Sequence, residues 1–325
     1  MRVLVTARLP EHVLSLISRN HETVMHGEDR PIDRGRFLES IQDKDGLLCT
    51  VTDRIDRELL DRAPNLKMIA NNGVGYDHID VGAATCRGIP VSNTPGVLTD
   101  STADLTFALI LAVARRIAEG DRMVREGRFR FWAPFQFLGF DVSGKTIGII
   151  GLGRIGKAVA RRAAGFGMKV IYFCRSRIDP SQERELNVVY ASLDELLREA
   201  DFVSLHVPLH SETRHLIGGR ELALMKPSAC LVNAARGPIV DEKALVEALR
   251  SGEIAAAGLD VYENEPELSP GLADLSNVVL VPHVGSATIE TRTRMASMAA
   301  ENLLTGLKGE HPPNCINWTS LSGKA

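Results

Sequence analysis

One stretch, KTIGIIGLGRIGKAVARR at residues 145–162, constrains the fold more than any other part of the chain. Its apolar first part predicts a strand, its last part predicts a helix, and three glycines, Gly151, Gly153 and Gly156, lie between them. The first glycine permits a tight turn, the second lets the backbone approach a pyrophosphate, and the third lets helix and strand pack closely. The free N–H groups of the helix then face the phosphates. The stretch predicts a dinucleotide site with loop contacts from Gly151, Leu152, Gly153, Arg154, Ile155 and Gly156.

Short apolar runs alternate with helical patterns along the rest of the chain, which predicts a parallel α/β sheet. In the first hundred residues the runs are RVLV, TVM, GLLCTV, KMIANN and IPVS, and a second series extends from KTIGII to VVLVP. A chain of 325 residues is long enough for two domains of ordinary size. Since the glycine motif lies in mid-chain, the first hundred residues belong to something other than the cofactor domain. A single large sheet is the alternative.

Two long helices and one loop are expected from the pattern of apolar residues. Apolar positions at helical spacing predict a helix over about 102–119, which Asp100 or Ser101 can cap. A second helical pattern covers about 288–307. Residues 127–141 are aromatic and contain glycine and proline, so we expect a loop there.

Composition and charge exclude several classes of protein. The net charge is −3 with acids and bases interspersed, which argues against a nucleic-acid-binding surface. No stretch of about 18 uncharged apolar residues occurs, so we expect no membrane helix. The start, MRVLVTARLP, is typical of a first strand rather than a signal peptide. Five cysteines without a CxxC pattern indicate reduced thiols and a cytoplasmic protein.

The second strand of the dinucleotide unit ends in an unusual way, VIYFCRSR at 170–177. An NAD site normally has an acidic residue here to bind the adenosine ribose, but this chain has Cys174 followed by Arg175, Ser176 and Arg177. An acid would repel a 2′-phosphate, whereas two arginines and a serine suit one. We therefore expect NADP to be preferred, with NAD as a second cofactor. The alternative is that both arginines are merely solvated.

Several further motifs follow in a recognisable order. They are NNGVGYDHID (71–80), NTPGVLTDSTADL (93–105), NAARGPIVDE (233–242), GLDVYENEP (258–266) and VPHVGSAT (281–288). Together with GLGRIG they resemble the D-isomer-specific 2-hydroxyacid dehydrogenase family, and the glyoxylate/hydroxypyruvate reductases most of all. The likeness covers essentially the whole chain.

The resemblance implies a particular domain arrangement. Residues 1–99 and 287–325 would form a flavodoxin-like substrate domain, into which a Rossmann NAD(P)-binding domain of residues 100–286 is inserted. It also implies a homodimer joined through the cofactor domain, with the segment 120–141 reaching the partner. Trp132, Phe135 and Phe137 are candidates for entering a partner's active site.

The implied reaction is hydride transfer between a nicotinamide and C2 of a 2-keto or 2-hydroxy acid. Arg236 follows the strand ACLVNA, and its planar guanidinium can bind the substrate carboxylate and carbonyl together. His283 follows the strand VVLVP and suits proton exchange. Glu265 would bind and orient His283. Glu263 and Glu267 compete for that role, and we favour Glu265 because it directly precedes a proline.

The resemblance also implies further contacts. The backbone N–H groups of Val74 and Gly75 would bind the substrate carboxylate. Nicotinamide contacts would come from Thr102, Ala234, Ala235, Asp260, Gly285 and Ser286, and adenine contacts from Val207 and Pro208. Three histidines, His206, His210 and His215, lie close in sequence, but Pro208 interrupts any shared helix face. We expect no metal site.

Other functions stay open at this point. Phosphoglycerate dehydrogenase and 2-ketogluconate reductase belong to the same family, and the sequence does not rank their substrates against glyoxylate and hydroxypyruvate. Some relatives are cofactor-sensing corepressors that bind partner peptides. The complete set of Arg236, Glu265 and His283 favours an enzyme over such a binding protein.

Overall fold

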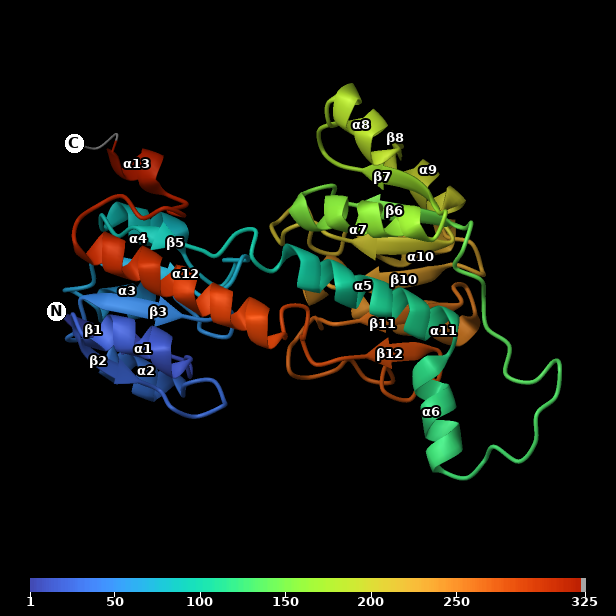
Figure 1. Cartoon of the computed structure of the whole chain (residues 1–325), viewed down its shortest axis with the longest axis horizontal. Helices are drawn as coiled ribbons and strands as arrows, with labels where there is room; N and C mark the ends of the chain where they lie inside the picture. Colours follow the sequence, from blue (N-terminus) through green and yellow to red (C-terminus); the bar gives the residue numbers. More distant parts are fainter. Residues whose placement is uncertain (323–325) are drawn as a thin grey trace. The chain divides into compact units, whose positions relative to one another are not determined.

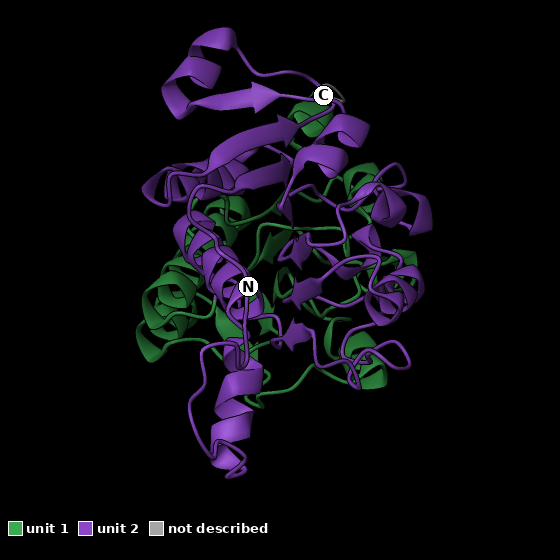
Figure 2. Ribbon diagram, turned by 90° about the vertical axis from the view of Figure 1, so that its right-hand side faces the viewer, with its two compact units in different colours: residues 1–98, 287–325 green, residues 99–286 purple. Residues whose placement is uncertain are grey.

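The computed structural model of the chain describes residues 1–322. The chain forms two compact units (Figure 2). Unit 1 comprises Met1–Leu98 and the segment that begins at Ala287, and unit 2 is Thr99–Ser286. Each unit has its own parallel sheet and its own hydrophobic core.

Unit 1 contains a five-stranded sheet in the order β2-β1-β3-β4-β5, with every neighbouring pair parallel. This strand order is that of the flavodoxin-like fold. The strands are β1 (Arg2–Val5), β2 (Glu22–Met25), β3 (Gly46–Cys49), β4 (Met68–Asn71) and β5 (Val91–Ser92). The helices are α1 (Glu11–Ser18), α2 (Arg34–Ser40), α3 (Arg57–Asp61), α4 (Val81–Cys86), α12 (Ile289–Leu307) and α13 (Trp318–Ser322).

The long helix α12 covers one face of the unit 1 sheet. Its side chains Leu303 and Leu307 are buried in the same cluster as Met68 of β4. Gly306 lets the helix lie this close, because a Cβ there would overlap the Met68 side chain. All four residues of β3 and of β4 are buried, as expected for parallel strands covered on both faces.

Unit 2 contains a seven-stranded sheet in the order β12-β11-β10-β9-β6-β7-β8, again with parallel pairs (Figure 1). The chain order reverses between β6 and β9, which is the arrangement of a Rossmann domain and the usual place for a ligand. The strands are β6 (Thr146–Ile150), β7 (Lys169–Phe173), β8 (Val188–Tyr190), β9 (Phe202–Leu205), β10 (Cys230–Asn233), β11 (Ala256–Leu259) and β12 (Val278–Leu280). The helices are α5 (Thr99–Ala114), α6 (Ile117–Arg125), α7 (Arg154–Gly165), α8 (Pro180–Leu186), α9 (Leu193–Glu199), α10 (Gly219–Leu224), the 3-10 turn η1 (Gly237–Ile239) and α11 (Glu242–Ser251).

The helix expected over about 102–119 is wrong in both its bounds and its continuity. Helix α5 already begins at Thr99, so neither Asp100 nor Ser101 precedes it as a cap. It ends at Ala114 because Arg116 adopts a left-handed conformation (φ 53°), after which α6 begins. Arg116 is held in place by Glu119, with Nε to Oε2 at 2.9 Å.

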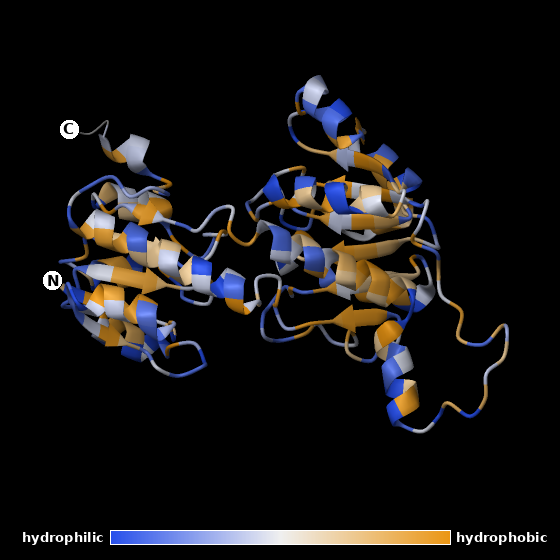
Figure 3. Ribbon diagram, viewed as in Figure 1, coloured by the Kyte–Doolittle hydropathy of each residue, from blue (hydrophilic) through white to orange (hydrophobic). Residues whose placement is uncertain are grey.

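The loop expected at 127–141 is confirmed, since residues 126–145 contain no helix or strand. The helix expected over about 288–307 is confirmed as α12, and the side chain of Thr288 caps it by accepting from the Thr291 N–H. Figure 3 shows that the strands of both sheets are mainly hydrophobic. Within residues 1–322, no helix is long and apolar enough to cross a membrane.

Candidate active site

The glycine loop between β6 and α7 has the geometry that a bound pyrophosphate needs. Gly151 has a φ of +97°, and a Cβ there would lie 2.7 Å from the His206 carbonyl oxygen. A Cβ on Gly156 would overlap the Gly151 carbonyl oxygen, whereas a Cβ on Gly153 would meet nothing within 4 Å. The outer two glycines therefore serve the packing of the loop, and Gly153 leaves an open approach to the N-terminus of α7. These residues fit a dinucleotide phosphate.

The two arginines of the segment after β7 have different surroundings. Arg177 binds the carboxylate of Glu183 through two bonds, Nε to Oε1 and Nη2 to Oε2, both at 2.7 Å. The Tyr172 hydroxyl donates to the same carboxylate at 2.6 Å. Arg175 is 85% exposed, and its nearest acid, Glu212, is 3.7 Å away. Arg175 thus extends into solvent, while Arg177 is tied to α8 through Glu183.

Glu183 is a residue that sequence reasoning missed. It is 8% exposed, although it carries a charge. The hydrogen bonds from Arg177 and Tyr172 lower the pKa of Glu183 to about 2, against a smaller opposing effect of burial. No local sequence signal reveals this contact, because it forms only when α8 packs beside β7.

Cys174 lies next to the glycine loop, where its Sγ is 2.9 Å from the Leu152 N.

His283 and Glu265 are brought together as the sequence suggested. The His283 Nδ1 and the Glu265 Oε2 are 2.9 Å apart, and both side chains are 35% exposed. The other oxygen of Glu265 accepts from the Tyr262 N–H at 3.0 Å. Burial alone would raise the pKa of Glu265, but the hydrogen bond and charge of His283, the Tyr262 N–H and Arg236 together lower it. Glu265 is therefore an ionised partner of the imidazole near neutral pH.

A buried carboxylate fixes the turn that carries His283. Asp260 is 1% exposed and follows β11. Its two oxygens accept from the Val284 N–H at 2.6 Å and the Gly285 N–H at 2.8 Å, and its carbonyl accepts from the His283 N–H at 2.9 Å. His283 has a φ of 51°, a conformation that side-chain-bearing residues rarely adopt and that is typical of functional sites.

The same turn accounts for the positions of Thr102 and Asp260, two residues predicted to contact the nicotinamide. The Thr102 hydroxyl donates to the Gly285 carbonyl at 3.2 Å, which ties α5 to the turn. Burial raises the pKa of Asp260, while the Val284 and Gly285 N–H groups and His283 oppose that change. Each of its oxygens accepts from a backbone N–H, so Asp260 fixes the shape of the turn. Ser286 follows Gly285 at the end of unit 2.

Arg236 lies at the carboxyl end of β10, on a segment held from two sides. The Asn233 side chain accepts from the Ala235 N–H at 3.0 Å and donates to the Arg236 carbonyl at 2.8 Å. A Cβ on Gly237 would overlap the Tyr262 carbonyl, so a glycine is required where this segment meets the strand-end loop that leads to Glu265. Sequence reasoning missed Asn233 and Tyr262. Ala234 and Ala235 lie between β10 and Arg236.

Of the three acids considered as partners of His283, Glu263 and Glu267 form other contacts. Glu263 Oε1 is 2.6 Å from His215 Nε2, and the Glu263 N–H donates to buried Glu242 at 2.6 Å. Glu267 lies farther along the loop, where its N–H donates to the Asn264 carbonyl. The peptide between Glu265 and Pro266 is cis.

The three histidines near β9 have different surroundings. His206 bonds to Ser204 through Nε2 at 2.8 Å, and burial lowers its pKa to about 4. His215 pairs with Glu263, and the His210 N–H donates to the Thr213 hydroxyl.

Val207 packs close to the glycine loop, because a Cβ on Gly151 would lie 2.8 Å from its Cγ1. The Pro208 carbonyl accepts from Thr213 at 2.7 Å.

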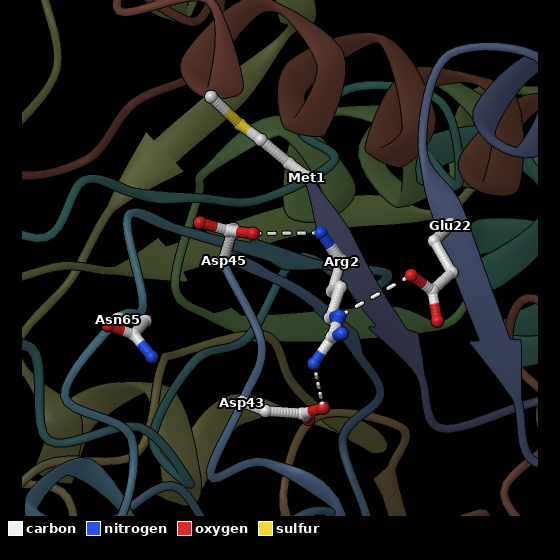
Figure 4. Close-up of a pocket in the computed structure, with 6 residues that line it drawn as sticks. All are labelled: Met1, Arg2, Glu22, Asp43, Asp45 and Asn65. Atoms are coloured by element: carbon white, nitrogen blue, oxygen red, sulfur yellow. Dashed lines mark hydrogen bonds and ion pairs between the residues drawn. The ribbon is translucent and has the colours of Figure 1, made fainter.

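A hollow at one end of the unit 1 sheet offers no catalytic chemistry. Its centre is Arg2, which pairs with Glu22 at 3.4 Å and Asp43 at 2.7 Å while its N–H donates to Asp45 at 2.8 Å (Figure 4). Arg2 and Glu22 begin their strands. Ligands of parallel α/β sheets bind outside the opposite, carboxyl ends of the strands. The hollow is lined by Met1, Arg2, Glu22, Asp43, Asp45 and Asn65.

Comparison with known proteins identifies the family. The family model described as "D-isomer specific 2-hydroxyacid dehydrogenase, NAD binding domain" matches residues 107–285. A glyoxylate reductase of Thermococcus litoralis is 52% identical over 320 residues, which cover 97% of this chain and 96% of that protein.

Two solved structures extend the likeness. The TT0316 protein of Thermus thermophilus has a TM-score of 0.91 and 50% identity, covering 97% of this chain and 100% of the other. An NADPH-dependent glyoxylate/hydroxypyruvate reductase of Sinorhizobium meliloti, in complex with NADP and malonate, has a TM-score of 0.86 and 34% identity, covering 98% of this chain and 97% of the other. This chain is therefore a member of the D-isomer-specific 2-hydroxyacid dehydrogenase family and an NAD(P)-dependent oxidoreductase.

Proposed function

We propose that the enzyme reduces glyoxylate to glycolate or hydroxypyruvate to the D-2-hydroxy acid, with NADPH as the preferred reductant. The observation that carries the proposal is the His283–Glu265 pair at 2.9 Å, with the segment of Arg236 packed against the loop that leads to Glu265. These residues follow β10, β11 and β12, whose carboxyl ends lie along one edge of the Rossmann sheet. The curated relatives with about half of their residues identical carry the name glyoxylate reductase.

Each residue has a distinct task in this proposal. The cofactor, when bound, supplies the hydride. Arg236 binds the carboxylate and polarises the carbonyl through two coplanar N–H groups. His283 donates the proton from Nε2, because its Nδ1 is held by Glu265. The Glu265 carboxylate orients the ring and offsets its positive charge.

The preference for NADPH rests on Arg175. It follows Cys174, which replaces the acid of an NAD site, and its guanidinium is 85% exposed. Ser176 stands next to it as a second donor. Arg177 helps indirectly, since its bonds to Glu183 hold the far end of the segment. NAD would bind without the phosphate contacts, and hence more weakly.

We also propose a homodimer joined through unit 2. The segment after α6 exposes large apolar side chains that a monomer would leave in water, and such patches mark interaction sites. They are Phe129 (51%), Phe131 (66%), Trp132 (78%), Phe135 (88%) and Leu138 (59%). Light scattering on the purified protein would give the mass of a dimer, and a monomer at micromolar concentration would contradict this part. The predicted cytoplasmic location agrees with five free cysteines.

The test of the reaction is a substrate panel. Glyoxylate, hydroxypyruvate, 2-ketogluconate and 3-phosphohydroxypyruvate are assayed with NADPH and with NADH. We expect the highest kcat/KM for glyoxylate or hydroxypyruvate with NADPH. Arg236→Lys keeps the charge but not the planar fork, and we expect a loss of about 10- to 100-fold in kcat/KM, the range of a charge-assisted hydrogen bond. A preference for 3-phosphohydroxypyruvate or 2-ketogluconate would overturn the proposal.

A further inference from the structure

The segment Gly73–Tyr76, directly after β4, has three consecutive carbonyls bound by the interior of unit 1. The Asn71 side-chain amide donates to the Gly73 carbonyl at 3.1 Å and to the Gly75 carbonyl at 2.8 Å. The Asn93 amide donates to the Val74 carbonyl at 2.8 Å. The Thr94 N–H adds a second donor to Gly73 at 3.0 Å. Every carbonyl from 73 to 75 is thus directed toward β4 and the residues that follow β5.

A trans peptide is planar, so its C=O and the N–H of the next residue point in opposite directions. Because three successive carbonyls are held inward, the N–H groups of Val74, Gly75 and Tyr76 point the other way. No group among residues 1–322 accepts a hydrogen bond from these three N–H groups. Successive outward N–H groups form a concave site for an anion.

The two asparagines that hold this segment are buried. Asn71 is 0% exposed and uses both hydrogens of its amide, and Asn93 is 8% exposed. Gly73 adds close packing, because a Cβ there would lie 2.9 Å from Val51 Cγ1 and one of the two would have to shift. The conformation of the segment is therefore set by neutral side chains and close packing.

We infer that Asn71 and Asn93 are positioning residues for a carboxylate cradle, in which the Tyr76 N–H is a third donor beside those of Val74 and Gly75. The inference rests on the proposed function, which supplies the 2-keto acid. The cradle has no charged group of its own, so it selects a carboxylate by the direction of its N–H groups. The cradle bears on substrate affinity, whereas the proton and hydride steps belong to unit 2.

The first experiment measures steady-state kinetics of Asn93→Ala, with Asn317→Ala as a matched control. Asn317 is another buried unit 1 asparagine, 5% exposed, whose amide donates to the Ile89 carbonyl at 3.0 Å and not to the 73–76 segment. We expect the KM for glyoxylate to rise about 3- to 10-fold in Asn93→Ala, from the loss of one hydrogen bond. The kcat and the KM for NADPH should stay within about twofold. Asn317→Ala should lose stability without a change in the KM for glyoxylate.

The second experiment uses the unaltered protein. The chain contains a single Gly–Tyr pair, Gly75–Tyr76, so ¹³C-carbonyl glycine with ¹⁵N-tyrosine labels one peptide that NMR can select. Oxalate, an unreactive analogue with two carboxylates, is titrated into the NADP-saturated enzyme. We expect the Tyr76 N–H signal to shift with the same saturation curve as inhibition. In Asn93→Ala the shift should need about 3- to 10-fold more oxalate.

The two failures are distinguishable. An enzyme that neither reduces a small 2-keto acid nor binds oxalate overturns the proposed function and the cradle with it. An enzyme that reduces glyoxylate and is inhibited by oxalate, but shows no shift at Tyr76 and equal kinetics in Asn93→Ala and Asn317→Ala, overturns the cradle alone.

Discussion

The two units of this enzyme hold their loop segments in place with different kinds of side chain. In unit 2 the turn at 283–285 is fixed by the Asp260 carboxylate, and the segment after β7 by the Glu183 carboxylate. In unit 1 the segment 73–76 is fixed by the neutral amides of Asn71 and Asn93. A carboxylate is protonated in acid and then loses its charge, whereas a neutral amide does not titrate. In the proposed function, the supports of the proton donor and of the 2′-phosphate site are therefore sensitive to acid, whereas the supports of the segment 73–76 are not.

The largest expected effect is at the centre of the unit 2 site. His283→Gln removes the proton donor and should lower kcat by about two to four orders of magnitude, the usual range for a general acid. Stopped-flow measurement of NADPH oxidation would check it. The KM for glyoxylate should change much less, because the cradle and Arg236 remain. A variant with more than about a tenth of the wild-type kcat would exclude His283 as the donor.

The next effect separates the two arginines after β7. Arg175→Ala should raise the KM for NADPH by about 10- to 100-fold, from the loss of charge-assisted hydrogen bonds to the 2′-phosphate. The kinetics with NADH should change little, because NADH has no such phosphate. Arg177→Ala is the matched control. Since Arg177 binds Glu183, this variant should weaken both cofactors alike and lower thermal stability.

Two results would contradict this interpretation of the arginines. If Arg175→Ala affects NADPH and NADH equally, the guanidinium does not bind the phosphate. If Arg177→Ala loses NADPH selectivity without a change in thermal stability, then the Glu183 pair opens when the cofactor binds.

A moderate effect is expected at Glu265. Glu265→Gln keeps the shape of the side chain but removes the charge beside His283, so reduction should fail at a lower pH than in the wild type. The kcat should fall less than in His283→Gln, because the proton donor is still present. A pH–rate profile of both enzymes would measure the change. Coincident profiles would show that Glu265 is not the electrostatic partner.

The smallest effect concerns stability in acid. The pKa of Glu183 is lowered from 4.5 to about 2 by Arg177 and Tyr172, so its stabilising contribution is complete above pH 4.5 and is lost as the pH falls toward 2. Glu183→Gln should therefore reduce the steepness of acid unfolding in this range. Circular dichroism during an acid titration would measure it. Asn71 and Asn93 cannot titrate, so Asn93→Ala should leave that steepness unchanged.

Much of the fold and part of the site could be predicted from the sequence. The fold class and the family are confirmed, because the glycine loop and the ordered motifs are local patterns that specify a known architecture. Strand positions followed from short apolar runs such as that of β6. The break at Arg116 could not be predicted, because neither glycine nor proline marks it, and an acid three residues on supports the strained residue.

The supporting contacts were beyond the sequence for a physical reason. Glu183, Asn93 and Tyr262 act on residues that only the packed structure brings beside them. The ion pair of Arg177 could not be predicted either, because the buried carboxylate that binds it lies on α8, and its place among the cofactor ligands stays a prediction.

The composition of unit 1 from two separate parts of the chain has a consequence for biosynthesis. Strands β1 to β5 leave the ribosome first, but α12 follows only after the whole of unit 2 has been made. Until then Met68 and its neighbours on β4 lack the helix that buries them. Nascent chains arrested before Ala287 should therefore hold a folded unit 2 beside a half-covered sheet, and such exposed apolar surface is what chaperones bind. We therefore expect this apolar surface to stay uncovered for the time that separates Leu98 from Ala287 during translation.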